Sequence, residues 1–529
     1  MEKALAIEKS ETIPMPASLI ADADEAKAWE HALDRRRALR LYSTGVWFAA
    51  LVSLALVMEG FDTKILGSLY AIDAFHVDFG ELADDGTYQI PASWQSGLGG
   101  IMGVTSIMGM FLGGWATERF GFRKTMMAAL ASMPPIIFGF FFATRVEDLA
   151  VATFFFAWPI GTFQTVTTVY VAEITPNALR PYLTSCYALA WALGQLLNAA
   201  VFRGTLTLPS PWIYRVPFAL QWFWPPFLLI GVYLAPESPW WLVRQGRVVE
   251  AETVVSRITS NDPSVPVGKL VALMVYTTEH ERTVEAGTSY LACFRGAHLR
   301  RTIVIIGVYI MQILSGAPLR AWMTYFFQQA GLPTDQSFNM TIVALVLSVL
   351  GVLSAWIVMT YAGRRQMYLW GNLLSVVIFV AIGAMGIRQK TSSDAMLGWG
   401  IGSLLAVDGF IANLLLLPVT FVLVSEIPST LLRTKSIVIA RNIYMVTSIF
   451  TNTITPYMIN PTAWDWGALT GFWWAGASLI GLTFTFFMIP ESKGRTNAEM
   501  DILFEQRTHV RKFKGAKVDF AQAEEKNVP

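Results

Sequence analysis

Twelve long apolar runs constrain this 529-residue chain more than any other feature of its sequence. They span residues 44–71, 95–115, 125–143, 149–172, 181–203, 217–236, 301–328, 338–361, 366–387, 397–424, 434–459 and 466–490. A helix needs roughly 20 apolar residues to cross a bilayer. Only 15% of the residues are charged, against about 25% in soluble proteins. We therefore predict an all-α, multi-pass membrane protein with twelve transmembrane helices, which excludes most soluble enzymes and nucleic-acid-binding modules.

Lys and Arg in the connections between these runs predict the orientation. Residues 72–93 contain five acidic side chains and no Lys or Arg, whereas the connection at 237–300 is rich in both cations. Since connections rich in Lys and Arg stay in the cytoplasm, we expect both termini to be cytoplasmic. The N-terminal segment contains no apolar core ahead of a cleavage site, so we interpret it as a retained tail and not as a signal peptide.

Three motifs occur twice, once in each half of the chain. ERFGFRK (118–124) pairs with YAGRRQM (361–367), AEITPNALR (172–180) with SEIPSTLLR (425–433), and PESPWWL (236–242) with PESKGRT (490–496). Because the three pairs are separated by nearly the same number of residues, we infer two repeated six-helix halves. Such halves rock about a midplane site to give alternating access. The expected domains are an N-terminal tail (1–43), a first half (44–236), a cytoplasmic linker (237–300), a second half (301–490) and a C-terminal tail (491–529).

These motifs resemble those of the sugar porter family of the major facilitator superfamily, in which PESPWWL and PESKGRT correspond to signatures at the ends of the two halves. MEGFDTKILGSLYAI (58–72), TYFFQQAG (324–331) and SEIPSTLLRTKSIVIAR (425–441) are similar to the fungal alpha-glucoside, or maltose, permease group. The resemblance implies a plasma-membrane carbohydrate transporter, not an enzyme, that takes up a disaccharide or oligosaccharide together with protons. It favours a maltose-type alpha-glucoside and leaves lactose and cellobiose open.

The expected partners are the sugar, protons and the lipid bilayer. The resemblance implies no cofactor, because the proton gradient supplies the energy, and we expect a monomer without a nucleic-acid partner. Two cysteines, Cys186 and Cys293, cannot supply a four-ligand metal site.

Glu59 and Asp62 are the candidate proton carriers. They lie three residues apart in the first run and so share one helix face. An ionisable residue at the centre of a membrane helix costs about 2.5–3.5 kcal/mol on insertion scales, so two of them need a functional reason. The alternative is that they only ion-pair with a cation and fix helix packing. Arg441 matches a basic position of the resembling permeases and is the expected counter-charge, with Lys64 as a second candidate.

Two positions depart from the pattern of the resembling permeases. Ser106 stands where these permeases commonly have another acid in the second run. Arg320 stands in the seventh run, where they have small or apolar residues. This arginine could restore the charge balance, gate the path differently, bind an acidic group or disable transport.

Sugar recognition requires amides and hydroxyls that pair with sugar hydroxyls, together with aromatic faces. Gln195 and Gln312 match sugar-contacting positions of the sugar porters. Gln164, Asn442 and Tyr325 are further candidates because they are polar or aromatic residues within the runs. The alternative role of these amides is an interhelical hydrogen bond, worth about 0.6 kcal/mol on average.

Charged residues at the cytoplasmic ends of the runs are candidates for gating salt bridges that break when the inside opens. They are Glu118, Arg119, Arg123, Glu173, Arg180, Glu426 and Arg433. The leading hypothesis is thus a proton-coupled sugar symporter. A sugar-sensing receptor with little or no transport, and an uncoupled uniporter, are the alternatives.

Overall fold

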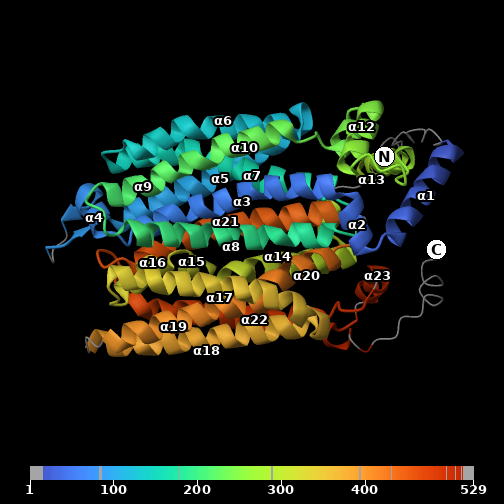
Figure 1. The fold of residues 1–529 in the computed structure, drawn as a ribbon. Helices are drawn as coiled ribbons and strands as arrows, with labels where there is room; N and C mark the ends of the chain where they lie inside the picture. Colours follow the sequence, from blue (N-terminus) through green and yellow to red (C-terminus); the bar gives the residue numbers. More distant parts are fainter. Residues whose placement is uncertain are drawn as a thin grey trace, which may run out of the picture.

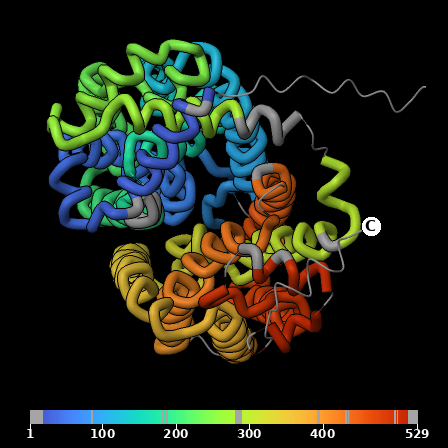
Figure 2. Tube along the Cα trace, turned by 90° about the vertical axis from the view of Figure 1, so that its right-hand side faces the viewer, coloured from blue at the N-terminus to red at the C-terminus, as the bar shows by residue number. Residues whose placement is uncertain are grey.

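The computed structural model describes residues 16–82, 86–176, 178–286, 290–391, 395–429, 432–495, 497–506, 508–513 and 515. Long helices run side by side along the molecule (Figure 1). Figure 2, turned by 90°, looks along these helices and shows them in two groups, one from each half of the chain. Within the described residues, ten helices are long and apolar enough to cross a membrane.

The first group contains the helices of the first six predicted runs. They are α3 (Ser43–Leu69), α5 (Ala92–Phe120), α6 (Phe122–Phe141), α7 (Val146–Ile174), α8 (Arg180–Thr205), and a sixth element made of α9 (Trp212–Leu220), the 3₁₀ turn η1 (Gln221–Phe223) and α10 (Trp224–Leu234). Pro225 lies in the first turn of α10, where a missing N–H costs nothing. The sixth element passes from α-helix to a 3₁₀ turn at η1 and back to α-helix at α10.

The second group repeats this plan with two interrupted elements. Its members are α14 (Gly296–Leu314), α15 (Ala317–Ala321), α16 (Met323–Gln329), α17 (Thr334–Tyr361), α18 (Arg364–Thr391), α19 (Ala395–Ile411), the π-helical turn η3 (Ala412–Leu416), α20 (Leu417–Glu426), α21 (Arg433–Ile459), η4 (Gly467–Leu469) and α22 (Thr470–Met488). The predicted run 301–328 is the broken series α14, α15 and α16. The break falls at Gly316, whose φ of 87° is a conformation that glycine adopts readily.

All twelve predicted runs coincide with helices. Ten of them contain the membrane-length helices, and the other two, 181–203 and 301–328, correspond to α8 and to the broken series. The prediction of an all-α membrane fold with two helical halves is therefore confirmed.

The remaining elements lie at the two ends of the bundle (Figure 1). At one end, which we call the α4 end, are α4 (Asp73–Phe79) and the short antiparallel strands β1 (Glu81–Leu82) and β2 (Tyr88–Gln89), paired as Glu81 with Gln89 and Leu82 with Tyr88. At the other, which we call the terminal end, are α1 (Ala17–Ala32), α2 (Arg35–Leu41), α11 (Pro239–Arg244), α12 (Val248–Ile258), α13 (Val267–Ala286), η2 (Tyr290–Phe294), α23 (Asn497–Glu505) and η5 (Val510–Lys512).

The two halves meet along a small set of helices. α5 packs on α21, α8 packs on α17, and α3 contacts α16. α3, α5 and α8 come from the first half, and each therefore faces the second half along part of its length. The first of these, α3, carries the predicted acidic pair.

Candidate functional site

Backbone contact between α3 and α8 fixes the segment of α3 that carries Glu59 and Asp62. A Cβ at Gly60 would lie 2.2 Å from a main-chain oxygen of α8, and a Cβ at Gly194 would lie 2.0 Å from a main-chain oxygen of α3. Only glycine permits such an approach, because any side chain would push the helices apart. The two carboxylates therefore sit on a stretch of helix with little freedom to shift.

Both carboxylates are buried and each is held by one amide. Glu59 is 1% exposed, and its Oε1 accepts a hydrogen bond of 2.7 Å from Nε2 of Gln164 on α7. Asp62 is 4% exposed, and its Oδ1 accepts a bond of 2.8 Å from Nε2 of Gln221 on η1. The second oxygen of each group, Glu59 Oε2 and Asp62 Oδ2, has no hydrogen-bond partner in the described part of the chain. A carboxyl with an unpartnered oxygen has room for a proton there.

Gln221 is a site residue that the sequence analysis missed. It lies in η1, where the sixth element changes its winding, and it is 2% exposed. Its signal was available, because an amide within an apolar and aromatic run needs a partner in a membrane. Gln164 was predicted to bind sugar, but the structure brings its amide onto Glu59 instead.

Arg441 approaches the acidic pair from the second half but does not form an ion pair with it within 4.0 Å. Its guanidinium lies 4.5 Å from the ring centroid of Tyr444 and 5.9 Å from that of Tyr309. Its guanidinium therefore makes cation–π contacts within the second half, and its role as the counter-charge of the acidic pair stays a prediction.

Lys64 does not partner the acidic pair either. It is 3% exposed, and its Nζ donates hydrogen bonds to the main-chain oxygens of Arg320, at 3.2 Å, and Ala321, at 2.5 Å. The expectation that Lys64 balances the charge of Glu59 or Asp62 is therefore wrong, because its ammonium group binds the carbonyls at the end of α15.

Arg320 forms a buried ion pair with Asp408 on α19. The NH1–Oδ2 distance is 2.5 Å, and the two side chains are 9% and 0% exposed. NH1 also donates to the Ser315 main-chain oxygen at 2.7 Å, and Ser375 on α18 donates to Asp408 Oδ1 at 2.8 Å. Since Asp408 matches the charge of Arg320, this arginine does not serve to restore the charge balance altered by Ser106. Asp408 was missed although an Asp inside an apolar run is itself a functional signal.

The predicted sugar-binding residues divide by burial. Tyr325 on α16 is fully buried, and Gln312 on α14 is 8% exposed. The Tyr325 hydroxyl and the Gln312 Oε1 have no hydrogen-bond partner among the described residues. Gln195 on α8 is half-buried, and Asn442 on α21 is exposed. Gln312 and Tyr325 therefore retain unused polar atoms for a ligand.

Ser106 lies where α5 and α7 touch. Its main-chain oxygen would be 2.0 Å from a Cβ at Gly161, one turn before Gln164 on α7. Ser106, where the resemblance led us to expect an acid, is thus close to the helix turn that supplies the Glu59 partner.

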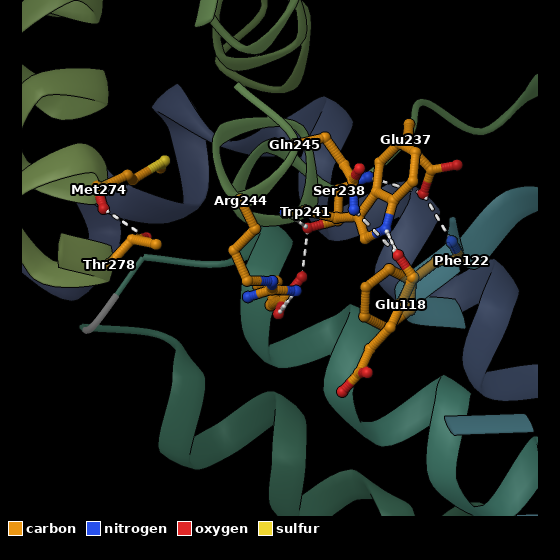
Figure 3. Close-up of polar contacts among 10 residues, drawn as sticks. Glu118, Phe122, Glu237, Ser238, Trp241, Arg244, Gln245, Met274 and Thr278 are labelled. Atoms are coloured by element: carbon orange, nitrogen blue, oxygen red, sulfur yellow. Dashed lines mark hydrogen bonds and ion pairs between the residues drawn. The ribbon is translucent and has the colours of Figure 1, made fainter. Parts of the chain in front are cut away.

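The charged motifs of the first half form one cluster at the terminal end, drawn in Figure 3. Glu173 pairs with Arg244 at 2.9 Å and accepts a hydrogen bond from the Ser238 hydroxyl. Glu237 accepts from the main-chain N–H groups of Phe122, at 2.9 Å, and of Ser238, at 3.1 Å. Burial raises the pKa of Glu237, and these main-chain hydrogen bonds oppose the rise. The cluster thus joins α7, α6 and α11 within one half.

Among the other predicted gating residues of the first half, Glu118 contacts this cluster through its main chain, whereas Arg119 and Arg123 lie against aromatic rings. The Glu118 main-chain oxygen accepts from Trp241 at 2.9 Å and from Gln245 at 3.0 Å (Figure 3). Arg119 lies 5.7 Å from the ring centroid of Trp115, and Arg123 lies 4.9 Å from that of Tyr233. The side chain of Arg180 lies outside the described residues.

The second half repeats this cluster. Glu426 pairs with Arg364 at 3.2 Å and accepts from the Ser492 hydroxyl at 2.6 Å. Glu491 accepts from the Arg364 main-chain N–H at 2.8 Å, as Glu237 does from Phe122. Arg433 has its Nε and NH2 buried without a hydrogen-bond partner among the described residues. The serine and main-chain contacts of the repeated motifs are therefore repeated in each half. The arginine that pairs with the glutamate comes from α11 in the first half and from α18 in the second.

Contacts that join the two halves gather towards the α4 end. Gln328 donates to Asp73 at 3.1 Å, and Arg203 donates from Nε to Asn339 Oδ1 at 2.8 Å. Further cross-half contacts are Ser96 to the Thr453 main-chain oxygen at 2.6 Å, Asn460 to the Ile90 main-chain oxygen at 2.9 Å, and the stacked rings of Tyr70 and Trp322 at 5.0 Å. The α4 end is therefore held closed.

No group of three or more His, Cys, Asp or Glu side chains suited to a metal ion occurs in the described ranges. This observation concerns those ranges alone.

Comparison with known proteins identifies the family. The family described as "Sugar (and other) transporter" matches residues 48–504. The general alpha-glucoside permease of Saccharomyces cerevisiae is 35% identical over 97% of this chain and 83% of its own length. Maltose permease MAL61 of the same organism is 36% identical over 95% of this chain and 82% of its own.

A solved structure with the same fold is the xylose transporter XylE from E. coli in a partially occluded inward-open conformation. It has a TM-score of 0.67, is 19% identical, and the match covers 86% of this chain and 100% of that one. The fold is that of the major facilitator superfamily, and the family consists of transporters, not enzymes. This chain belongs to the sugar transporter family.

Proposed function

We propose that this protein is a proton-coupled symporter for a disaccharide or oligosaccharide that works by alternating access. The observation that carries the proposal is the buried acidic pair on α3, in which Glu59 and Asp62 each keep one oxygen without a hydrogen-bond partner among the described residues. A proton carrier must be able to gain and lose its proton during the cycle. A carboxylate locked in a tight ion pair does so with difficulty, and neither of these two is locked.

The coupling follows from the position of the acidic pair. Glu59 and Asp62 lie on α3 in the first half, whereas Arg441, their proposed counter-charge, lies on α21 in the second half. A proton on Glu59 removes its charge and so weakens the attraction between the halves. Protonation of Glu59 thereby favours a rearrangement of the halves, and symport requires that sugar binding favour the same rearrangement.

The substrate class is proposed from the relatives and from unused polar atoms. The similar permeases of Saccharomyces cerevisiae are described as alpha-glucoside and maltose permeases. Gln312 and Tyr325 retain a carbonyl oxygen and a hydroxyl without partners among the described residues, and Gln195 and Asn442 complete the proposed sugar site. We therefore favour a maltose-type alpha-glucoside, with lactose and cellobiose as the next substrates to test.

The protein spans the membrane several times, and we propose that it works in the plasma membrane with both termini in the cytoplasm. The proposed energy source is the proton gradient, without a further cofactor, and the proposed functional unit is a monomer. In this orientation the α4 end faces outward, and the contacts there close the outer side.

The test is uptake of labelled maltose into cells that lack sugar permeases, with external pH recorded. We expect saturable uptake accompanied by alkalinisation of the medium. Binding of maltose without uptake would favour a sugar-sensing receptor. Uptake without alkalinisation would favour an uncoupled uniporter. In that case the buried carboxylates would not carry a proton.

A further inference from the structure

The short helix α15 is bound by charged groups from both halves of the molecule. From the first half, Lys64 Nζ donates to the main-chain oxygens of Arg320 and Ala321, at 3.2 and 2.5 Å. These are the last two residues of α15. The last carbonyls of a helix have no partner within the helix and form its negative end. A buried ammonium group is therefore well matched to this place.

From the second half, the Arg320 side chain fixes α15 to its neighbours. NH1 donates to Ser315 O at 2.7 Å and to Asp408 Oδ2 at 2.5 Å, and NH2 donates to the Ser315 hydroxyl at 3.3 Å. Ser315 directly follows α14 and precedes the break at Gly316, and Asp408 lies on α19. The guanidinium thus bridges the break and ties α15 to the helices behind it.

We propose that Lys64 and the end of α15 form a latch that holds the two halves together at the α4 end, and that Arg320 is a positioning residue for it. Arg320 holds the two carbonyls where Lys64 can reach both. When the halves separate at this end, the Lys64 ammonium group loses its hydrogen bonds to these two carbonyls. Its charge must then be hydrated by water instead. The strength of the latch therefore sets the fraction of molecules that are open at this end.

The latch also explains two charges that the coupling scheme leaves unused. Lys64 lies two residues from Asp62, yet its ammonium group binds the main-chain carbonyls of α15. Arg320 lies on α15 itself, and its charge is matched by Asp408. Each cation is satisfied away from the acidic pair. The inference rests on the proposed function only in that alternating access is the motion resisted by the latch.

A cysteine at Ser96 reports opening at this end without transport. Ser96 on α5 is 5% exposed and donates to Thr453 O on α21, across the interface. The probe protein is the full chain with Ser96→Cys, Cys186→Ser and Cys293→Ser, purified in detergent and labelled with a fluorescent maleimide. Since a hydrogen bond to a charged group is among the stronger ones, we expect Lys64→Met to raise the labelling rate about tenfold. Lys64→Arg, which keeps the charge, should stay within about threefold of the parent protein.

A double-mutant cycle tests the role of Arg320. The neutral pair Arg320→Leu with Asp408→Leu leaves no unpaired charge, so it removes the tether without the penalty of a lone buried ion. It should raise labelling about as much as Lys64→Met. Adding Lys64→Met to it should change the rate by less than about twofold, because both act on one contact. Multiplied effects would overturn the positioning role.

The control is Lys390→Gln, which removes an exposed ion pair with Asp465 at the same end but within the second half; it should label at the parent rate. Labelling of Lys64→Met at the parent rate would overturn the latch. If Lys64→Met is not recovered folded, Lys64→Gln gives the same comparison. Labelling needs neither sugar nor a proton gradient, so its failure and a failure of coupled uptake are separate results.

Discussion

The two halves of this transporter hold their buried carboxylates in opposite ways. In the first half, Glu59 and Asp62 each receive one hydrogen bond from a glutamine and keep one oxygen without a described partner. In the second half, Asp408 is paired with Arg320 and also accepts a bond from Ser375. The first arrangement leaves room for a proton, whereas the second uses both oxygens. Under the proposed function, the first half would change its charge during the cycle and the second half would keep its charge.

At the terminal end the halves are alike. Ser238 binds Glu173 as Ser492 binds Glu426. The two halves thus have equivalent serine–glutamate contacts at the terminal end, and they differ in the partners of their buried carboxylates. The following predictions start with the largest expected effect.

Breaking the Arg320–Asp408 pair on one side should have the largest effect. Asp408→Leu leaves the Arg320 charge buried and unpaired, which costs about 3–5 kcal/mol in comparable pairs. We expect a large drop in the melting temperature of the purified protein, measured by thermal unfolding in detergent. Arg320→Leu with Asp408→Leu should recover most of the loss. Equal stability of the single and double variants would contradict a tight pair.

Glu59→Gln should remove coupling but preserve the fold. The amide is close to a permanently protonated carboxyl in shape, and Gln164 can still reach its oxygen. We expect loss of uphill maltose accumulation with retention of exchange between labelled and unlabelled sugar, measured in proteoliposomes. Accumulation at the parent level would exclude Glu59 as the proton carrier.

Removing the amide partners should have a smaller effect. A hydrogen bond to a charged group is worth about 1.5–3 kcal/mol, so Gln221→Leu should favour protonated Asp62 over ionised Asp62. We expect maltose uptake to depend on external pH over a range shifted upward, measured from initial rates between acid and neutral pH. Gln245→Leu, at the exposed terminal end, is the matched control. An unshifted profile would remove Gln221 from the site.

The matched clusters at the terminal end should respond alike and modestly. Ser492→Ala removes one hydrogen bond to Glu426, which is worth less than the buried bond to Asp62, about 1 kcal/mol, because solvent screens the 32% exposed Glu426 side chain. Ser238→Ala should give a similar loss of melting temperature, because it removes the equivalent bond to Glu173. A loss confined to one half would show that the contacts are not equivalent in strength.

Much of the fold could be predicted because it depends on local sequence. Runs of apolar residues indicate where helices lie, and the repeated motifs indicate two halves. The acidic pair was found because Glu59 and Asp62 are conspicuous in an apolar helix. The expectation that Arg441 opposes them came from the family resemblance, and it stays a prediction.

The partners of the buried charges could not be predicted in this way. Asp408, Gln221 and the carbonyls that bind Lys64 come from other helices, and their direction depends on helix rotation and on the breaks at η1 and Gly316. In a helix that is apolar on every face, the sequence pattern does not indicate which face meets which neighbour. Arg320 was therefore unexplained until α19 was seen beside it.

The central claim is that the proton is carried by the first half and not by the Arg320–Asp408 pair. The most direct test is the number of protons taken up per maltose, from alkalinisation and labelled uptake in the same cells. We predict that Arg320→Leu with Asp408→Leu alters the rate but keeps this ratio, whereas Glu59→Gln with Asp62→Asn allows downhill maltose entry with a ratio near zero. A ratio that survives the loss of both acids, or that disappears with the Arg320–Asp408 pair alone, would contradict the account.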